Sequence, residues 1–391
     1  MKYVVVGGGI AGVSCANEIL RLDKSPESEV ILISASSFVK SVENYRKVGQ
    51  YGEKFDVKET EHSKLFPDHR FRFVNDVVTS WNAQNKEVHL QKTGTAQFEK
   101  LCIATGSRPR GQQELAADQR FLFLRDTQSA MELRKQLESK RNVLIVGNGG
   151  IATELMYELT DVNVTWLVRE EWICASFFPQ DMEGFIEQRL LAGRPDGYKH
   201  GGVLKHRRHT NSSSRENIGI VPFGPALGPD WCASIEFGKG RNERTVRILR
   251  NCQIEKCRTD GDLVVEYTDK SDGKKELKPD IVIWAVGVRP NSEEWAVGKG
   301  LKVSEKGGIE VNDAFETSIS DVFACGDVCS LSSSSPIWTQ RQLWTQARQE
   351  GEVCGRSMAS GAEEARMQSM YFELFSHCTT FFGTKGGILW G

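Results

Sequence analysis

The sequence predicts an α/β protein built from two Rossmann-like domains, and three observations lead to this fold class. An apolar run, a glycine-rich turn and an amphipathic helix occupy residues 4–20. The same succession returns at residues 143–159. Strand–turn–helix units of this kind are typical of doubly wound parallel sheets. The 391 residues are also enough for two or three domains with sizeable cores.

The composition is that of a globular protein, with 39% hydrophobic and 26% charged residues. A net charge of −2 gives no general attraction to nucleic acid or anionic membranes, so neither partner is expected. No apolar run reaches the roughly 18 residues that a transmembrane helix needs. Ten cysteines without metal-like pairs favour a reducing compartment, and a strand at the first residues leaves no room for a leader peptide. We therefore expect a protein of the cytoplasm or nucleus.

The elements are expected in the following order. Residues 3–7 and 30–34 are β-branched runs that flank a helix, which predicts a βαβ unit. Residues 71–90 alternate like an antiparallel meander, and residues 101–106 predict a buried strand that ends in glycine. A charged helix is expected over residues 126–142, before the second βαβ unit.

Residues 193–250 break this regularity. The segment is polar, basic and rich in Gly and Ser, which predicts an exposed, flexible insertion. Its basic run of Lys205, Arg207 and Arg208 fits a partner or nuclear-import patch, although a solvated loop is the commoner reason for a short charge run. Ordered pattern then returns, ending in a helix expected over residues 341–359.

The first glycine-rich turn has the spacing G-x-G-x-x-G. Gly7 permits the tight bend, Gly9 lets the backbone approach a pyrophosphate, and Gly12 lets helix and strand pack closely. Free N–H groups at the start of the helix supply the anion site. This turn therefore predicts a dinucleotide site.

The second turn repeats the pattern about 140 residues later. Gly147 and Gly149 take the first two positions, and Ala152 takes the third. One such turn is weak evidence, but two of them, each between a strand and a helix, indicate two dinucleotide sites.

The end of the second strand in each unit bears on the choice of coenzyme. An acid is expected there to bind a ribose, yet Ser34 stands in the first unit, and a hydroxyl binds a ribose more weakly than a carboxylate. In the second unit we match this position to Arg169, which Glu170 follows. Arginine favours a 2′-phosphate and therefore NADPH, while Glu170 keeps NADH open.

Three further signatures follow the turns: "ATG" at 104–106, "GVRPN" at 287–291 and "TSISDVFACGD" at 317–327. With the two turns, this ordered set resembles the pyridine nucleotide–disulfide oxidoreductase family. These are flavoproteins with two dinucleotide-binding domains, such as glutathione reductase, the NADH peroxidases and the ferredoxin reductases. The resemblance covers residues 1–370.

The resemblance implies FAD on the first unit and NAD(P)H on the second. It divides the chain into a discontinuous FAD domain (1–113 and 301–370), an NAD(P)H domain (114–300) that carries the insertion, and the start of a C-terminal domain (371–391). Members of the family continue for roughly another hundred residues, so we expect a truncated C-terminal domain, as in a splice form or a shortened chain.

The resemblance also assigns residues around the flavin. Asp327 matches the aspartate that binds the ribityl–pyrophosphate region, although an N-cap is the plainer alternative. Thr105 and Gly106 mark a close pass of backbone and FAD. Thr345 and Gln346 begin a helix whose positive end would face flavin N1 and C2=O.

Two further residues belong to the nicotinamide side. Glu154 falls where the family places a glutamate beside the carboxamide, and complementarity to the helix dipole is its plain alternative. Gly287 marks a close backbone pass to NAD(P)H.

The redox cysteines of the disulfide reductases are missing, because no cysteine stands between Cys15 and Cys102. Lys40 instead occupies the place where the non-thiol branch puts Arg or Lys over flavin N5, and an ordinary surface lysine is about equally expected. Cys325 and Cys329 form a C-x3-C that offers another redox pair, but spacing alone does not establish bridge geometry, and buried packing is the commoner role.

The segments "PALGPDW" (225–231) and "FELFSH" (372–377) resemble a eukaryotic branch of the family that also lacks the redox pair. This resemblance implies a nuclear and cytoplasmic protein with a role in the oxidative stress response, associated with the tRNA-splicing ligase complex.

The sequence thus predicts an FAD-dependent NAD(P)H oxidoreductase that passes a hydride to the flavin and then electrons to oxygen or an unknown acceptor. Two alternatives stay open. One is a slow flavoprotein binding module that shields a partner's metal site. The other is a disulfide reductase that uses Cys325 and Cys329.

Overall fold

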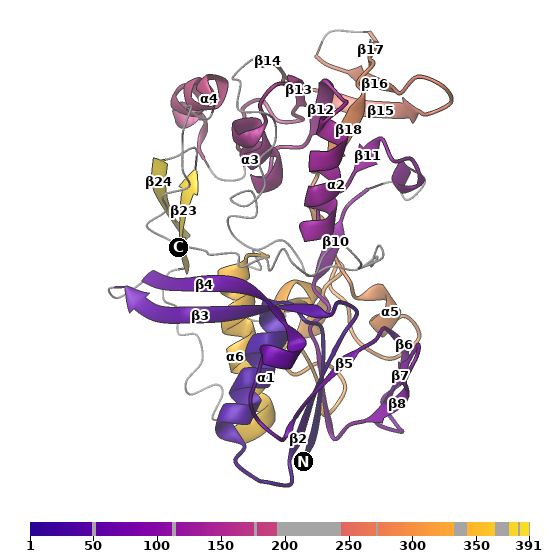
Figure 1. The fold of residues 1–391 in the computed structure, drawn as a ribbon, viewed down its shortest axis with the longest axis vertical. Coiled ribbons are helices and arrows are strands. Elements are labelled where there is room, and N and C mark those ends of the chain that lie inside the picture. The colour runs from indigo at the N-terminus through magenta and orange to yellow at the C-terminus, as the bar shows by residue number, and fades with distance from the viewer. Residues whose placement is uncertain are drawn as a thin grey trace.

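The protein folds into two lobes, each built on a parallel sheet (Figure 1). The structure is a computed structural model. It describes residues 1–48, 52–111, 115–175, 178–193, 244–270, 273–331, 342–363, 375–381 and 384–390. The basic run at Lys205 to Arg208 and the segment 225–231 lie outside these residues.

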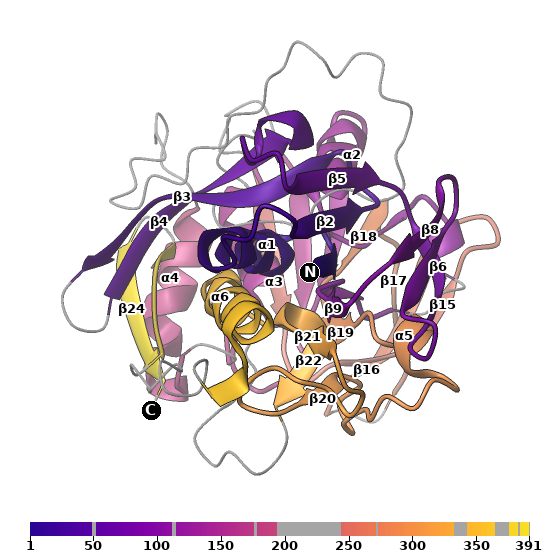
Figure 2. The ribbon, with the colours of Figure 1, turned by 90° about the horizontal axis from the view of Figure 1, so that it is seen from below.

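The first lobe contains a five-stranded parallel sheet in the order β21-β9-β1-β2-β5. Its strands are β1 (Lys2–Val6), β2 (Glu29–Ser34), β5 (Phe71–Asn75), β9 (Lys100–Ile103) and β21 (Val322–Ala324). The helices α1 (Ile10–Leu22) and α6 (Trp344–Ser360) lie side by side against it, as Figure 2 shows. Segments far apart in the sequence therefore build one lobe, since β21 joins the same sheet as β1.

The expected meander over residues 71–90 is wrong in its first part. β5 pairs in parallel with β2, and only β6 (Val78–Asn82), β7 (Glu87–Leu90) and β8 (Gly94–Gln97) form an antiparallel sheet. β5 is an edge strand that mixes half-buried and exposed residues, so its sequence resembles that of an antiparallel strand with one solvated face.

A long hairpin follows the first βαβ unit, where the sequence analysis made no assignment. It consists of β3 (Phe38–Val48) and β4 (Gly52–Glu61). A second hairpin, β23 (Phe375–Phe381) with β24 (Thr384–Trp390), lies near β4 (Figures 1 and 2).

The second lobe contains a parallel sheet in the order β11-β18-β12-β13-β14. The strands are β11 (Phe121–Leu122), β12 (Asn142–Val146), β13 (Asn163–Leu167), β14 (Thr245–Leu249) and β18 (Ile281–Trp284). One face carries α2 (Thr127–Leu137), α3 (Gly150–Glu158) and α4 (Glu183–Ala192). The other face carries a small antiparallel sheet of β15 (Gln253–Arg258), β16 (Val264–Thr268) and β17 (Lys275–Leu277).

The expected insertion at 193–250 is therefore too long. Residues 245–249 form β14 and pair in parallel with β13. The short run "TVRIL" alternates in burial like an edge strand, but it directly follows a polar segment that hides its start.

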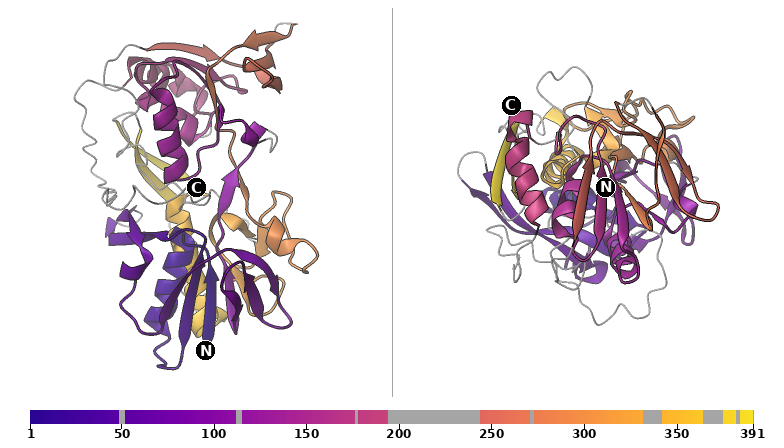
Figure 3. Two further views of the ribbon diagram at one scale, coloured as in Figure 1. Left: turned by 45° about the vertical axis from the view of Figure 1, so that its right-hand side comes forward. Right: turned by 90° about the horizontal axis from the view of Figure 1, so that it is seen from above.

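The lobes are joined by two adjacent strands, β10 (Ser107–Pro109) and β19 (Val288–Pro290), which pair antiparallel (Figure 3). The remaining elements are α5 (Glu293–Ala296), β20 (Ile309–Val311), β22 (Cys329–Leu331) and the 3-10 turns η1 (His62–Lys64), η2 (Leu115–Ala117), η3 (Gln180–Met182) and η5 (Gly326–Val328). Among the described helices, none combines the length and apolar character that crossing a bilayer requires.

Candidate functional site

A cavity of about 620 Å³ lies in the first lobe, where the carboxyl ends of its parallel strands meet. The strand order reverses around β1, and ligands of doubly wound sheets bind at such a reversal. The lining comes from the first glycine turn, the ends of β2, β9 and β21, and α6: it includes residues 6–11, 33–36, 104–108, 325–327, Lys40, Asn291 and Trp344.

The structure gives a separate reason for the presence of glycine at each position of the first turn. Gly7 has φ +130°, and an added Cβ would stand 2.1 Å from the carbonyl oxygen of Ala104. A Cβ on Gly12 would stand 2.0 Å from the carbonyl oxygen of Gly7. A Cβ on Gly9 would meet nothing within 4 Å, so the cavity wall stays open there. The first turn thus leaves space for a phosphate group against the start of α1.

The second turn repeats this geometry. Gly147 has φ +125°, and an added Cβ would stand 2.1 Å from the carbonyl oxygen of Ala285, just after β18. Gly149 again faces open space, while Ala152 is fully buried in α3. Each turn is therefore fixed against the end of its neighbouring parallel strand.

The structural equivalence of the two units differs from the one expected. The first glycine of each turn donates its N–H to the carbonyl of Ile33 in the first unit (2.8 Å) and of Leu167 in the second (3.1 Å). Val168, not Arg169, is therefore the counterpart of Ser34. The mismatch arises because register depends on this hydrogen bond, which the sequence does not display.

Arg169 lies one residue further and is 79% exposed at its side chain. Its guanidinium is 3.2 Å from Oε1 of Glu170. The Glu170 carboxylate also accepts a hydrogen bond from Nδ2 of Asn148, which lies within the second turn (3.2 Å). The arrangement leaves the arginine accessible to a phosphate and ties the glutamate to the turn.

The "ATG" and "GVRPN" motifs meet between the lobes. The Thr105 hydroxyl donates to the carbonyl of Asn291 (3.1 Å), and Nδ2 of Asn291 donates to the carbonyl of Thr105 (2.9 Å). The Asn291 N–H also donates to the carbonyl of Gly106 (2.9 Å). Gly287, with φ +94°, lies directly before β19 and is not among the residues that line the cavity.

Asp327 lies in η5 and lines the cavity. Burial raises the pKa of its carboxyl, and a hydrogen bond from the Ser107 hydroxyl (2.7 Å) opposes this rise. The turn that carries Asp327 is held by Glu350 of α6, which is fully buried and accepts the N–H of Gly326 at 2.7 Å. Ser107 and Glu350 were not predicted, since nothing near them in the sequence marks their long-range partners.

Cys325 and Cys329 do not face each other as a redox pair. The sulfur of Cys325 lies 3.5 Å from that of Cys102, while the sulfur of Cys329 lies 3.8 Å from Oε2 of Glu350. Contact with the Cys102 thiol raises the pKa of Cys325 to about 11, and burial raises that of Cys329. Both cysteines are therefore buried free thiols whose surroundings disfavour the reactive thiolate, which argues against the disulfide-reductase alternative.

The N-terminus of α6 opens on the cavity through Trp344. Thr345 and Gln346 follow in the first turn and are buried. The Thr345 hydroxyl has no hydrogen-bond partner within the described part of the chain. Neither Thr345 nor Gln346 is among the residues that line the cavity, so the start of α6 reaches it through Trp344.

Lys40 is not a surface lysine, because its side chain is only 2% exposed and lines the cavity. Its Nζ lies 3.2 Å from Oε2 of Glu59, a residue that the sequence analysis did not single out. Glu154 lies in α3 of the second lobe, half-buried, and is not among the residues that line the cavity.

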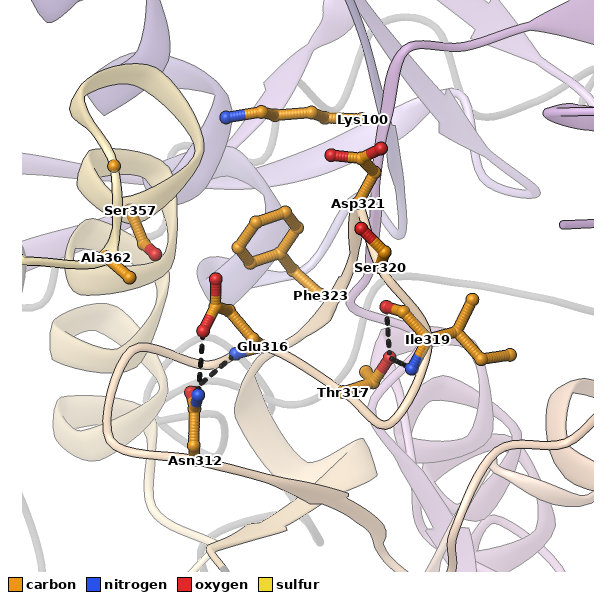
Figure 4. Close-up of a pocket in the computed structure, with 11 residues that line it drawn as sticks. Lys100, Asn312, Glu316, Thr317, Ile319, Ser320, Asp321, Phe323, Ser357 and Ala362 are labelled. Carbon is orange, nitrogen blue, oxygen red and sulfur yellow. Dashed lines mark hydrogen bonds between the residues drawn. The ribbon is translucent and has the colours of Figure 1, made fainter.

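A smaller pocket of about 300 Å³ opens beside the amino ends of β9 and β21 in the same sheet (Figure 4). Its charged groups already have protein partners. Nζ of Lys100 donates to the carbonyl of Met358 (2.6 Å), and Glu316 accepts from Nδ2 of Asn312 (2.7 Å). This pocket is separate from both glycine turns.

Comparison with known proteins identifies the family of this chain. The model of the family described as "Pyridine nucleotide-disulphide oxidoreductase" matches residues 1–193 and 236–351. The chain belongs to this family. Its members are FAD-containing, NAD(P)H-dependent oxidoreductases, so the expected fold class and the expected cofactors, FAD and NAD(P)H, are confirmed.

The chain is similar to proteins named "Pyridine nucleotide-disulfide oxidoreductase domain-containing protein 1". The Drosophila melanogaster relative is 34% identical over 98% of this chain and 81% of its own length. The Danio rerio relative is 35% identical over 100% of this chain and 82% of its own length. The Homo sapiens relative is 31% identical over 99% of this chain and 82% of its own length.

Solved structures share the fold at lower identity. A ferredoxin reductase from Rhodopseudomonas palustris has a TM-score of 0.68 at 18% identity, over 99% of this chain and 82% of that chain. An NAD-dependent persulfide reductase from A. fulgidus has a TM-score of 0.67 at 19% identity, over 98% of this chain and 62% of that chain. These likenesses concern the fold alone.

Proposed function

We propose that this flavin-dependent NAD(P)H oxidoreductase works without an active-site disulfide. The observation that carries the proposal is the buried pair of Lys40 and Glu59 in the hairpin that follows the first βαβ unit. The sequence has no cysteine between Cys15 and Cys102, so this part of the chain offers a cation instead of a thiol.

We propose that FAD occupies the cavity of the first lobe. Bound there, FAD supplies the chemistry, accepting a hydride from NAD(P)H and passing electrons to oxygen or another acceptor. The first turn would hold the pyrophosphate at Gly9, and Asp327 would accept a hydroxyl of the ribityl chain. The start of α6 and Lys40 would supply positive charge.

The test is a spectrum followed by a titration. The purified protein is expected to be yellow, and anaerobic NAD(P)H is expected to bleach its flavin absorption. Admission of air then separates two possibilities: rapid reoxidation supports an oxidoreductase that uses oxygen, whereas slow reoxidation with a long-lived charge-transfer band supports the binding module. A colourless protein that takes up no FAD would contradict the proposal.

We propose that NADPH is preferred over NADH. An aliphatic residue, Val168, stands where an acid would repel a 2′-phosphate, and the exposed Arg169 follows it. Arg169→Ala is expected to raise KM for NADPH about tenfold or more, the loss of a charge-assisted hydrogen bond, and to leave KM for NADH nearly unchanged. Arg72→Ala removes a comparably exposed arginine of the first lobe and is the control. Equal effects on both coenzymes would contradict the preference.

We also propose the biological role that the resemblance to the eukaryotic branch implies, protection of the tRNA-splicing ligase complex from oxidation in the nucleus and cytoplasm. This proposal rests on the resemblance of residues 225–231 and 372–377 to that branch. Co-precipitation of the ligase with the tagged protein, with and without NAD(P)H, tests it. Absence of the ligase under both conditions would count against the role but not against the flavin chemistry.

A further inference from the structure

We infer that Glu59 is a positioning residue, a counter-ion built into the β3–β4 hairpin that holds the Lys40 ammonium in place at the cofactor cavity. The inference rests on the proposed binding of FAD in that cavity. Glu59 acts on the cavity only through Lys40, because Lys40 lines the cavity and Glu59 does not.

The hairpin register brings the two side chains together. Lys40 in β3 stands directly opposite Glu59 in β4. Side chains directly opposite each other in an antiparallel pair lie close enough to interact. Nζ of Lys40 is 3.2 Å from Oε2 of Glu59, and each side chain is only 2% exposed. The pair is therefore shielded from water and from salt.

The main chain of Lys40 is fixed as well. Its N–H donates to the carbonyl of Gly8 within the first glycine turn (2.9 Å). Ser41 and Thr60, from the two residue pairs that flank Lys40 and Glu59, place their hydroxyls 3.1 Å apart across the hairpin. Lys40 thus takes its position from the dinucleotide turn through its backbone and from β4 through its side chain.

The charges decide what Glu59 does. A buried ammonium tends to lose its proton or to move toward water, because desolvation disfavours the charged form. A carboxylate 3.2 Å away opposes both changes. Without it, the cation at the cavity is weakened, and reduction of a nearby flavin, which gathers negative charge, becomes less favourable.

The test is a double-mutant cycle on the FAD-loaded protein, with the midpoint potential of the flavin as the readout. Glu59→Gln is expected to make two-electron reduction about tenfold less favourable, which corresponds to a potential about 30 mV more negative. Lys40→Met is expected to lower the potential at least as far. In the Lys40→Met background, Glu59→Gln is expected to change the potential no further.

Two variants complete the design. Glu43→Gln removes the exposed partner of Lys58 in the same hairpin and is expected to leave the potential unchanged. Glu59→Asp keeps the charge and is expected to restore much of the wild-type value. If Glu59→Gln does not fold, Glu59→Asp still gives a smaller shift in the same direction, because its shorter side chain lengthens the ion pair.

The outcomes separate this inference from the proposed function. A wild-type protein that binds no FAD would overturn the proposed function itself. A flavin-loaded Glu59→Gln protein with the wild-type potential would overturn the role of Glu59 alone. An equally large shift in the Lys40→Met background would also overturn it, since Glu59 would then act on the flavin without Lys40.

Discussion

Asp327 shows how a residue placed to bind a ligand can lower the stability of the FAD-free protein. Asp327 is partly buried, and the Ser107 hydroxyl donates a hydrogen bond to its carboxylate. The raised pKa means that the folded protein holds this proton more tightly than the unfolded chain does. The charged form is therefore disfavoured until a ligand supplies further donors.

This shift has a defined pH dependence. Because the folded protein binds the extra proton, the contribution of Asp327 to the stability of the FAD-free protein is greatest below the unfolded value of 3.8 and is lost as pH rises through the raised folded value. Asp327→Asn removes the charge, so we expect the FAD-free variant to be more stable than wild type at neutral pH and equally stable near pH 3.

The same substitution is expected to weaken FAD binding about 10- to 100-fold, the usual loss of a hydrogen bond to a charged group. Urea unfolding of the FAD-free proteins from pH 3 to 7.5, together with FAD titration, measures both effects. Asp321→Asn, at a partly exposed ion pair with Lys86, is the control. A variant that is less stable than wild type at neutral pH would contradict this account of Asp327.

Residue roles were predictable where a local steric rule applies. Close backbone approaches require glycine in both turns, and the spacing of these glycines alone predicts the two turns. Glu59, Glu350 and Ser107 were not predictable, because their roles depend on partners brought together by strand register and by packing of α6. A glutamate inside a polar run looks the same whether it ends up buried or exposed.

Among the elements of the first lobe, α1 and α6 pack closely against each other. A Cβ on Gly351 would stand 2.2 Å from the carbonyl oxygen of Ala11, and a Cβ on Gly355 would stand 2.6 Å from that of Cys15. The two glycines are four residues apart and share one face of α6. Their missing side chains let the helix backbones approach, which places the start of α6 beside the first turn.

Gly351→Val is therefore expected to destabilise the first lobe by about 3 kcal/mol or more, because a backbone carbonyl cannot move aside as a side chain can. Thermal unfolding of the FAD-free protein measures the change. Gly184→Ala is the control, since a Cβ at this position in α4 meets nothing within 4 Å. That control is expected to be neutral or stabilising by about 0.5–1 kcal/mol. Similar losses in both variants would contradict the packing argument.

Elements were predicted best where they combine a strong period with a turn signal. Both βαβ units follow from their apolar runs and glycines. The edge strands β5 and β14 were misplaced, since half-buried edges carry weak patterns. The β3–β4 hairpin was not predicted, because only the missing cysteines of this segment were considered and not the alternation of its residues.

At the scale of the whole molecule, the apolar cores of the two lobes are separate. The core of the first lobe gathers around β1, β2 and β9. The second sheet has a core on each face, one under its helices around Trp166 and one under β16 around Tyr267. The two-domain plan was predictable from the repeated turn.

This separation predicts two unfolding transitions for the FAD-free protein in calorimetry. FAD at 100 times its Kd is expected to stabilise the first lobe by about 2.7 kcal/mol and to leave the other transition almost in place. Gly351→Val identifies the transition of the first lobe by lowering it selectively. A single transition that FAD moves as a whole would show that the lobes unfold together.

The pairing of β10 with β19 has a consequence for protein engineering. The chain leaves the first lobe along β10 and re-enters it along β19, and Pro109 stands opposite Val288 across this pair. The second lobe is thus a segment whose two ends lie next to each other. A tight loop joining these two strands would remove the second lobe and leave the first lobe as one continuous chain. A foreign domain with closely spaced ends can be inserted at the same junction.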